Sequence, residues 1–443
     1  MKEKKCYEVI LECIRYDILE SIALILLLLF TINPFAKVFL HESKTEFWYM
    51  HQCNEAVLKI GVIIMFLYIF KLKTDGRLFT VKEFLKKNVA VVAFLMFGIL
   101  MIVTTLLNGA PQIAVIGDYY RGEGLIVFLS YIVYFLLAAF LLTENKKSII
   151  INAFLVTSLF VGIVIFVDYA FFDQKYNYAM ADNMVFSQFN HLGYYLLMSI
   201  MFFGMMFVNA KKVFLKIAYL CGFMFMTVVL IMNDTWGCQL ALFVGVIFAI
   251  IVCSIGKSKF QPITLVLVVA VLVSYLGTYF ASDKLKMRIE ANFVQQSHDT
   301  SALLNEENAE KATTGTARIA LWKHAFEYTM ERPLTGHGSD VTGRRLMKEA
   351  GNDRCHCEYL NYAVSFGIPA AIVYIVAVFM VFLRGLKKKK QLTDMNYAGL
   401  CVAFTYLASA LVGNTMYYTA PFLFIALGMG YVKNREMNAV REI

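Results

Sequence analysis

Long apolar segments recur along the whole chain, each about as long as a membrane-spanning helix, and polar connections separate them. They lack the strict alternation of apolar and polar residues that marks the strands of a membrane barrel. Because a backbone in lipid must satisfy its hydrogen bonds internally, this pattern predicts helices. Twelve segments can be assigned, at residues 18–40, 55–70, 88–107, 123–143, 149–172, 192–209, 216–232, 237–255, 262–281, 359–383, 397–413 and 418–432. The predicted fold is an all-α polytopic membrane protein with about 12 transmembrane helices, a single membrane domain over residues 1–443.

Composition agrees with this pattern. Hydrophobic residues make up 59% of the 443 residues and charged residues only 16%, whereas a soluble domain has about half and about a quarter. The first apolar segment follows a lysine-rich start but has no small-residue cleavage site behind it. We therefore expect an uncleaved first span rather than a signal peptide.

Positive charges fall in alternate connections, which predicts the orientation of the chain. Basic residues on the inner side of a membrane exceed those outside, so the lysine-rich connections are expected in the cytoplasm, together with both termini. The net charge of +9 is thus divided among separate loops, and a nucleic-acid surface is excluded as its explanation. The cations of the predicted inner side are Lys71, Lys73, Arg77, Lys82, Lys86, Lys87, Lys146, Lys147, Lys211, Lys212, Lys216, Lys257, Lys259, Arg384, Lys387–Lys390, Lys433, Arg435 and Arg441.

One connection differs from the others. Residues 282–358 form a large polar loop on the predicted outer face, with eleven Lys or Arg and twelve Asp or Glu. Within it, Ile319, Trp322 and Phe326 recur at helical spacing, which predicts a helix over 317–330 that Pro333 ends.

Two arginines on the outer side are candidates for binding phosphate. Arg121 lies where apolar sequence resumes after a short outer segment, and it could either extend to lipid headgroups or grip a phosphate. Arg318 lies one helical turn before Trp322, so a solvent-facing cation–π pair is the plain alternative.

His356 is predicted in the first turn of the helix that becomes the tenth span. There the positive end of the helix dipole disfavours imidazolium, so a neutral imidazole could accept a proton, although an interfacial histidine can also be inert. Cys355 and Cys357 flank it, but no further Cys/His set has ligand spacing, so the sequence does not support a metal site. Gly336 and Gly338 could be mistaken for a phosphate-binding loop. Because no strand precedes them and no Lys-Ser/Thr follows them, we expect a tight turn instead.

Together these motifs resemble the O-antigen ligase and polymerase family. The resemblance covers roughly residues 118–383 and is carried by an Arg and a Trp on a loop helix, a Pro…Gly-x-Gly turn and a His that opens a helix ending in Gly-Ile. One departure is Cys357, where the family usually has Asn after the His. The segments that match are 121–125, 189–190, 314–326, 332–338, 356–360 and 366–368.

The resemblance implies a glycan transferase of the membrane glycosyltransferase type. Its donor would be a polyprenyl diphosphate-linked glycan, its acceptor a glycan or lipid hydroxyl, and it would need no cofactor and no metal. The family pattern makes His356 the catalytic base and assigns the donor diphosphate to Arg121 and Arg318. Supporting positions are Asn190, Trp322, Gly336, Gly338 and Tyr359. The residues themselves agree with the implied metal independence. The outer segments contain no Asp-x-Asp that could hold a divalent cation, so arginines must neutralise the diphosphate.

Two other classes of protein stay open. A transporter or flippase often has twelve spans, but the large loop between spans nine and ten breaks two-fold symmetry, and the spans hold few buried charges apart from Asp168. A non-catalytic scaffold is the third class. Within the enzyme class, the sequence distinguishes neither ligase from polymerase nor one glycan from another, and it leaves the oligomeric state and the role of the two cysteines open.

Overall fold

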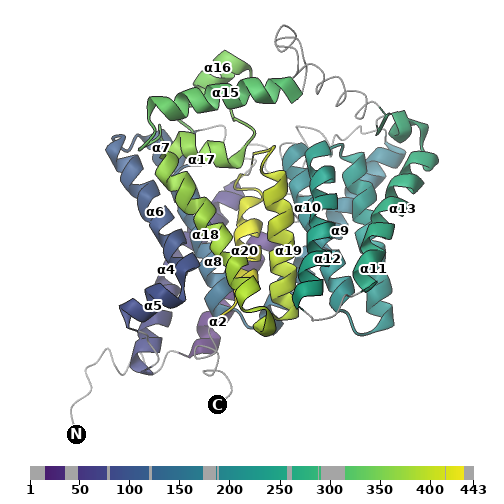
Figure 1. Ribbon diagram of the computed structural model, residues 1–443, viewed down its shortest axis with the longest axis horizontal. Helices are drawn as coiled ribbons and strands as arrows, with labels where there is room; N and C mark the ends of the chain where they lie inside the picture. The colour runs from purple at the N-terminus through teal and green to yellow at the C-terminus, as the bar shows by residue number, and fades with distance from the viewer. Residues whose placement is uncertain are drawn as a thin grey trace.

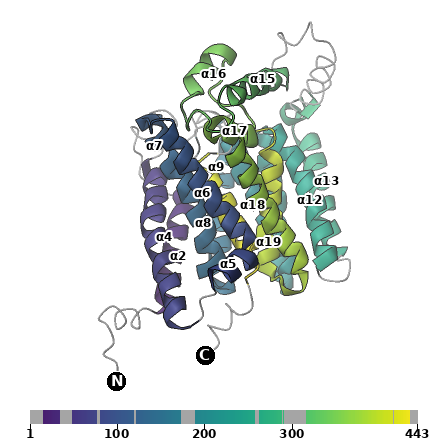
Figure 2. The same ribbon diagram turned by 60° about the vertical axis from the view of Figure 1, so that its left-hand side comes forward.

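The computed structural model describes residues 15–34, 48–76, 80–118, 122–172, 186, 189–256, 262–287, 289–290, 315–414 and 416–433. All regular secondary structure in these ranges is helical (Figures 1 and 2). The long helices run roughly side by side and form one bundle, and two shorter helices, α15 (Gly315–Glu331) and α16 (Gly343–Ala350), lie across one of its ends. We call this end of the bundle the loop end and the opposite one the basic end.

Each of the twelve predicted segments contains helix. The bundle helices are α2 (Tyr16–Thr31), α4 (Trp48–Thr74), α6 (Val89–Leu107), α8 (Leu125–Leu136) with its π-helical extension η1 (Leu137–Leu141), α9 (Glu144–Phe171), α10 (Phe189–Asn209), α11 (Val213–Met232), α12 (Trp236–Gly256), α13 (Leu265–Ala281) after the short η2 (Pro262–Thr264), α17 (Glu358–Phe366), α18 (Ile368–Lys387), α19 (Asp394–Ser409) and α20 (Ala420–Gly430). Shorter elements are α5 (Val81–Lys87), α7 (Gln112–Ile116) and η4 (Lys389–Gln391).

The all-helical membrane class is confirmed, but the number of spans stays a prediction. Among the described residues, seven helices are long and apolar enough to cross a membrane. Two further apolar helices, α8 with η1 and α20, are shorter. The predicted boundaries 1–443 and 282–358 and the cytoplasmic location of both termini likewise stay predictions.

The bundle has a buried centre and a periphery suited to lipid. The apolar window of α10 is 94% buried, whereas those of α11 and α13 are 39% and 33% buried. Helix α20 is buried along its whole length. At the centre, where no water is available, the Ser199 hydroxyl donates to that of Ser158 over 2.7 Å.

At the basic end, cations bind the carbonyl groups left over where helices stop. The Arg384 guanidinium donates to the carbonyls of Lys87 at 2.5 Å and Val432 at 2.6 Å. The Lys433 ammonium donates to the Phe140 carbonyl over 2.9 Å, at the end of η1. Because terminal carbonyls have no partner within their own helix, these cations satisfy groups that would otherwise be exposed to a poorly hydrated environment.

At the loop end, α15 and α16 are held together by Arg345. Its guanidinium donates to the two carboxylate oxygens of Glu331 at 2.8 and 2.9 Å and to Glu349 at 3.0 Å. The same guanidinium lies over the ring of Tyr328, 4.2 Å from the ring centroid. The predicted helix over 317–330 is therefore present and packs against its neighbour through a charged cluster.

The predicted span over 359–383 consists of two helices, because the structure divides it into α17 and α18 at Gly367, where the resemblance also implied the end of a helix. The Pro333 turn packs against this break: His337 N donates to Val364 O at 2.8 Å, and Ile368 N donates to Pro333 O at 2.8 Å. Gly367 has φ +85, and a Cβ there would lie 2.4 Å from Leu334 O. Only glycine allows both the backbone conformation and the close approach of the turn.

We expect Gly367→Ala to destabilise the protein strongly. The left-handed backbone alone costs about 1–3 kcal/mol for a residue with a side chain, and the contact with Leu334 O adds to this cost. The midpoint of thermal unfolding of detergent-purified protein measures the effect. Gly277→Ala in α13 is the matched control, since nothing lies within 4 Å of its Cβ position. Equal midpoints for the two variants would contradict the proposed role of Gly367.

Candidate active site

A buried ionic triad joins three segments at the loop end. Arg354 pairs with Asp340 and, at 3.4 Å, with Glu123 Oε2, and the three side chains are 5%, 2% and 1% exposed. Burial disfavours the charge on Arg354, but the two carboxylates outweigh it and hold the pKa of Arg354 above its usual range. The segments joined are the connection before α8, the turn after Pro333 and the segment before α17.

Hydrogen bonds fix the connection before α8 on this triad. Asp340 Oδ2 accepts from the backbone N–H groups of Asp118 and Glu123, both at 2.9 Å. Tyr131 donates its hydroxyl to Glu123 Oε1 over 2.8 Å, and the Ser339 hydroxyl donates to the Glu123 carbonyl. Both flanks of Arg121 are therefore anchored, while Arg121 itself lies outside the described residues.

His356 lies before α17 rather than within its first turn. The helix begins at Glu358 with Cys357 as its N-cap, and His356 has φ +49, in the left-handed region. Its ring nitrogen Nε2 lies 2.9 Å from the side-chain amide nitrogen of Asn352. With the amide donating, Nε2 is the unprotonated nitrogen of a neutral ring. Asn352 thus provides a side-chain amide beside His356, although the residue directly after His356 is Cys357 and not the Asn that is usual in the family.

Helix α15 brings a tryptophan and an arginine to this histidine. Trp322 Nε1 donates to the His356 carbonyl over 3.4 Å. Arg318, one turn earlier on the same face and partly buried, acts electrostatically on Tyr194 of α10 and Cys238 of α12. The structure therefore brings Trp322 to His356, where α15 packs against α17, and places Arg318 one turn before Trp322 on the same helix.

At the other predicted supporting positions, the contacts mainly hold turns and helices in place. Gly336 and Gly338 lie in the tight turn after Pro333, with φ +60 and +96. A Cβ on Gly336 would lie 2.5 Å from the Ser365 carbonyl carbon, so the turn needs glycine to pack on α17. Tyr359 donates its hydroxyl to the Leu407 carbonyl over 3.3 Å. Asn190 is partly buried in the first turn of α10.

Sequence reasoning missed a row of rings beneath these loops. His51 of α4 lies 4.4 Å from the Tyr417 ring, Tyr417 lies 4.1 Å from Tyr418, and Tyr418 lies 4.8 Å from His191 of α10, measured between ring centroids. The His51 ring also packs against Gly122, where a Cβ would lie 2.6 Å from His51 Nε2. The row connects the Arg121 connection with the start of α10. No local motif marks it, because its members come from three distant parts of the chain.

The two cysteines beside His356 are buried thiols. Burial raises the pKa of Cys355 to about 12 and also raises that of Cys357. The Cys355 thiol donates to the Cys357 carbonyl over 3.3 Å. Within the described residues, no three His, Cys, Asp or Glu side chains are grouped as metal ligands.

These features define a polytopic helical membrane protein with a polar site under a loop helix at one end of the bundle. The family model described as O-Antigen ligase matches residues 221–375, from within α11 to within α18. This match confirms the resemblance to the O-antigen ligase and polymerase family and supports glycan transfer at a membrane. Arg318, Trp322 and His356 lie inside the matched segment, whereas Arg121 and Asn190 lie before it. No curated protein matches the chain.

We expect Arg354→Met to destabilise the protein by about 3–5 kcal/mol, because it leaves two buried carboxylates without their counter-charge. Arg344→Met is the matched control. Arg344 pairs with Asp118 at 3.1 Å but is 79% exposed, and exposed pairs contribute only about 0–1 kcal/mol. Thermal unfolding of both purified variants tests the difference. Equally small shifts would show that the triad is not what joins the three segments.

Proposed function

We propose that this protein transfers a glycan from a polyprenyl diphosphate carrier to an acceptor hydroxyl at the loop end, on the outer face of the membrane. The observation that carries the proposal is the hydrogen bond from Trp322 on α15 to the carbonyl of His356 before α17, with Arg318 one turn before Trp322 on the same helix. All three residues lie within the segment that matches the O-antigen ligase model. A site at the end of a lipid-facing bundle also suits a donor that is itself anchored in the membrane.

His356 acts as the general base in this proposal. The acceptor hydroxyl replaces the Asn352 amide at Nε2, its oxygen attacks the anomeric carbon of the donor, and its proton passes to Nε2. The bond between the anomeric carbon and the diphosphate oxygen breaks, and the electron pair leaves with the polyprenyl diphosphate. The hydrogen bond from Trp322 to the His356 carbonyl holds the backbone of the base in place.

Arginines stabilise the charge that develops on the departing diphosphate. Arg318 supplies a planar fork of donors from α15, and Arg121 is proposed as the second cation. The anchoring of Asp118 and Glu123 on Asp340 favours this role, because it holds the Arg121 connection next to the turn that packs on α17. Asn190, Tyr359, Gly336 and Gly338 are proposed to support the site, and no metal is needed for the step.

We expect His356→Ala to lower the rate of glycan transfer by about 10²- to 10⁴-fold, equal to roughly 3–5 kcal/mol in the barrier. The assay follows product formation by purified protein given lipid-linked repeat units. A growing ladder from these units alone indicates a polymerase, whereas product that requires another acceptor indicates a ligase. Donor binding should be retained, since the arginines hold the diphosphate.

His324→Ala is the control for this variant, because His324 lies on the same loop helix and is bonded to Glu327 rather than to the site. Near wild-type turnover by His356→Ala would end the role as base. Loss of donor binding together with turnover would make His356 a diphosphate ligand instead. Vectorial movement of a lipid-linked glycan without any new glycosidic bond would favour the transporter class.

For Arg318→Lys we expect a loss of roughly 10- to 100-fold in transfer rate, because lysine keeps the charge but loses the paired donors. Arg344→Lys, which changes an exposed arginine near the same end, should have little effect. A chelator should leave the wild-type rate unchanged if arginines rather than a metal neutralise the diphosphate. Full activity of Arg318→Lys, or loss of activity in chelator, would argue against the arginine clamp.

A further inference from the structure

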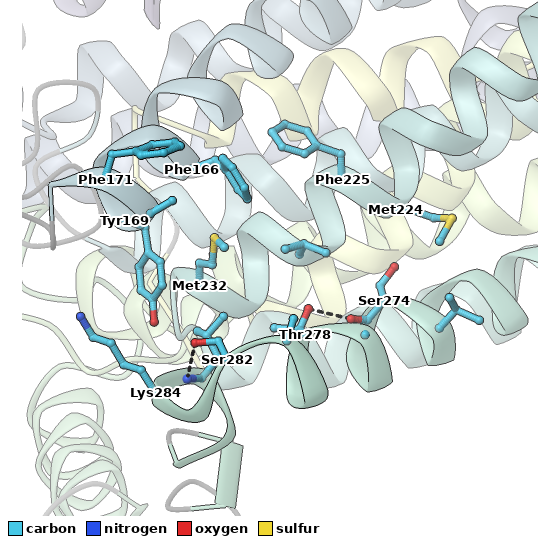
Figure 3. A pocket seen from close by; sticks show the side chains of 16 residues that line it. Phe166, Tyr169, Phe171, Met224, Phe225, Met232, Ser274, Thr278, Ser282 and Lys284 are labelled. Carbon is cyan, nitrogen blue, oxygen red and sulfur yellow. Dashed lines mark hydrogen bonds between the residues drawn. The ribbon is translucent and has the colours of Figure 1, made fainter.

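A cavity of about 760 Å³ lies between α9, α11 and α13 (Figure 3). Its walls are formed mainly by apolar side chains, among them Phe166, Met224, Phe225 and Met232. Since α11 and α13 are among the least buried of the candidate spans, the cavity belongs to the part of the bundle that faces lipid. Val273, which lines it, is 48% exposed.

Two of the hydroxyl groups in the wall are bonded within their own helix. Ser274 donates to the Ala270 carbonyl over 2.8 Å, and Thr278 donates to the Ser274 carbonyl over 2.7 Å. Both hydroxyls therefore satisfy their own helix and leave their methylene and methyl groups available for contact. Aromatic rings and flexible thioethers adapt well to an unsaturated, branched hydrocarbon chain.

A cation marks the loop-end rim of the cavity. Three walls stop there, where α9 ends at Phe171, α11 at Met232 and α13 at Ala281. Just beyond, the Lys284 ammonium lies over the Tyr169 ring, 5.1 Å from its centroid, and both residues line the cavity (Figure 3). An apolar cavity with a positive charge at its rim is complementary to a lipid with an anionic head.

The same rim adjoins the candidate active site. Met232 is followed by the turn that leads to Thr235, and Thr235 packs against Gly193 near the start of α10, where a Cβ would lie 2.6 Å from Thr235 Oγ1. Arg318 acts electrostatically on Cys238, three residues beyond Thr235. The turn between α11 and α12 thus links Met232, which lines the cavity, to the start of α12, where Cys238 lies within electrostatic range of Arg318.

We propose that this cavity holds the polyprenyl chain of the glycan donor, with its diphosphate leaving the rim at Lys284 towards Arg318. The inference rests on the proposed function for the identity of the lipid. A single flexible chain suits an apolar cavity that three helices wall and that is partly open, and a phosphate-bearing head suits the lysine at its rim. The cavity would therefore select donors by the length of their chain, while the active site selects their glycan.

Gly277→Leu tests this proposal, because nothing lies within 4 Å of the Cβ position of Gly277 and a leucine there would occupy the cavity without displacing a neighbour. Leu276→Phe is the matched control, since Leu276 is the adjacent residue of α13, is 56% exposed and does not line the cavity. Native mass spectrometry would measure binding of a long-chain polyprenyl diphosphate and of geranylgeranyl diphosphate. We expect Gly277→Leu to weaken binding of the long chain by roughly tenfold and to leave that of the short chain nearly unchanged.

Lys284→Gln tests the contribution of the diphosphate head to binding separately from that of the polyprenyl chain. It should weaken binding of the long-chain diphosphate but not of the uncharged polyprenol, whereas Gly277→Leu should weaken both. Should Gly277→Leu fold poorly by thermal unfolding, Val228→Phe fills the cavity from the α11 wall instead. Unchanged binding of the long chain in a folded cavity-filling variant would overturn the proposal. Loss of a co-purified phospholipid alone, with polyprenyl diphosphate binding intact, would also overturn it.

The two proposals fail in different ways. If the wild-type protein transfers glycan and a cavity-filled variant discriminates chain length as the wild type does, the cavity proposal is wrong and the function stands. If the protein binds long-chain polyprenyl diphosphate in the cavity but makes no glycosidic bond, the proposed function is wrong and the cavity site stands.

Discussion

The loop end depends on a positive charge that is almost closed to water. Arg354 can stay charged there only because Asp340 and Glu123 meet it, and each of these carboxylates is also held by further donors. A buried ion pair adds little net stability compared with an apolar packing of the same shape, but loss of one partner is costly. The triad therefore acts chiefly as a constraint. It allows one relative arrangement of three segments that are far apart in the sequence.

The rest of the candidate site follows from that constraint. With Asp340 held, the turn after Pro333 packs on the break between α17 and α18, and α15 is held across the end of the bundle. This arrangement brings Trp322 to the His356 carbonyl and places Arg318 within electrostatic range of Tyr194 in α10 and Cys238 in α12. A catalytic constellation needs such support, because small errors in position lower rates steeply.

Charged side chains have different partners at the two ends of the bundle. At the basic end, Arg384 and Lys433 bind carbonyls where helices stop, which suits a surface near lipid headgroups. At the loop end, charges are paired with one another and enclose a polar site. The weakly buried α11 and α13 form, together with α9, a mainly apolar cavity whose rim lies at the loop end of these helices. A lipid-anchored substrate would thus find a place for its chain and a place for its reacting head.

Much of this molecule could be predicted from its sequence, for a physical reason. Lipid forces every span to satisfy its own backbone, so apolar runs of sufficient length already specify the helices, and Pro333 and the spacing of Trp322 specify the loop helix. The candidate residues Arg318 and His356 could be found because their motifs are local. The pairing of Arg354 with Glu123 and Asp340 and the row of rings from His51 to His191 could not be predicted, because each depends on which distant segments meet. Only tertiary packing determines which of these segments come into contact. A contact between residues far apart in the sequence produces no recognisable periodic pattern in either segment.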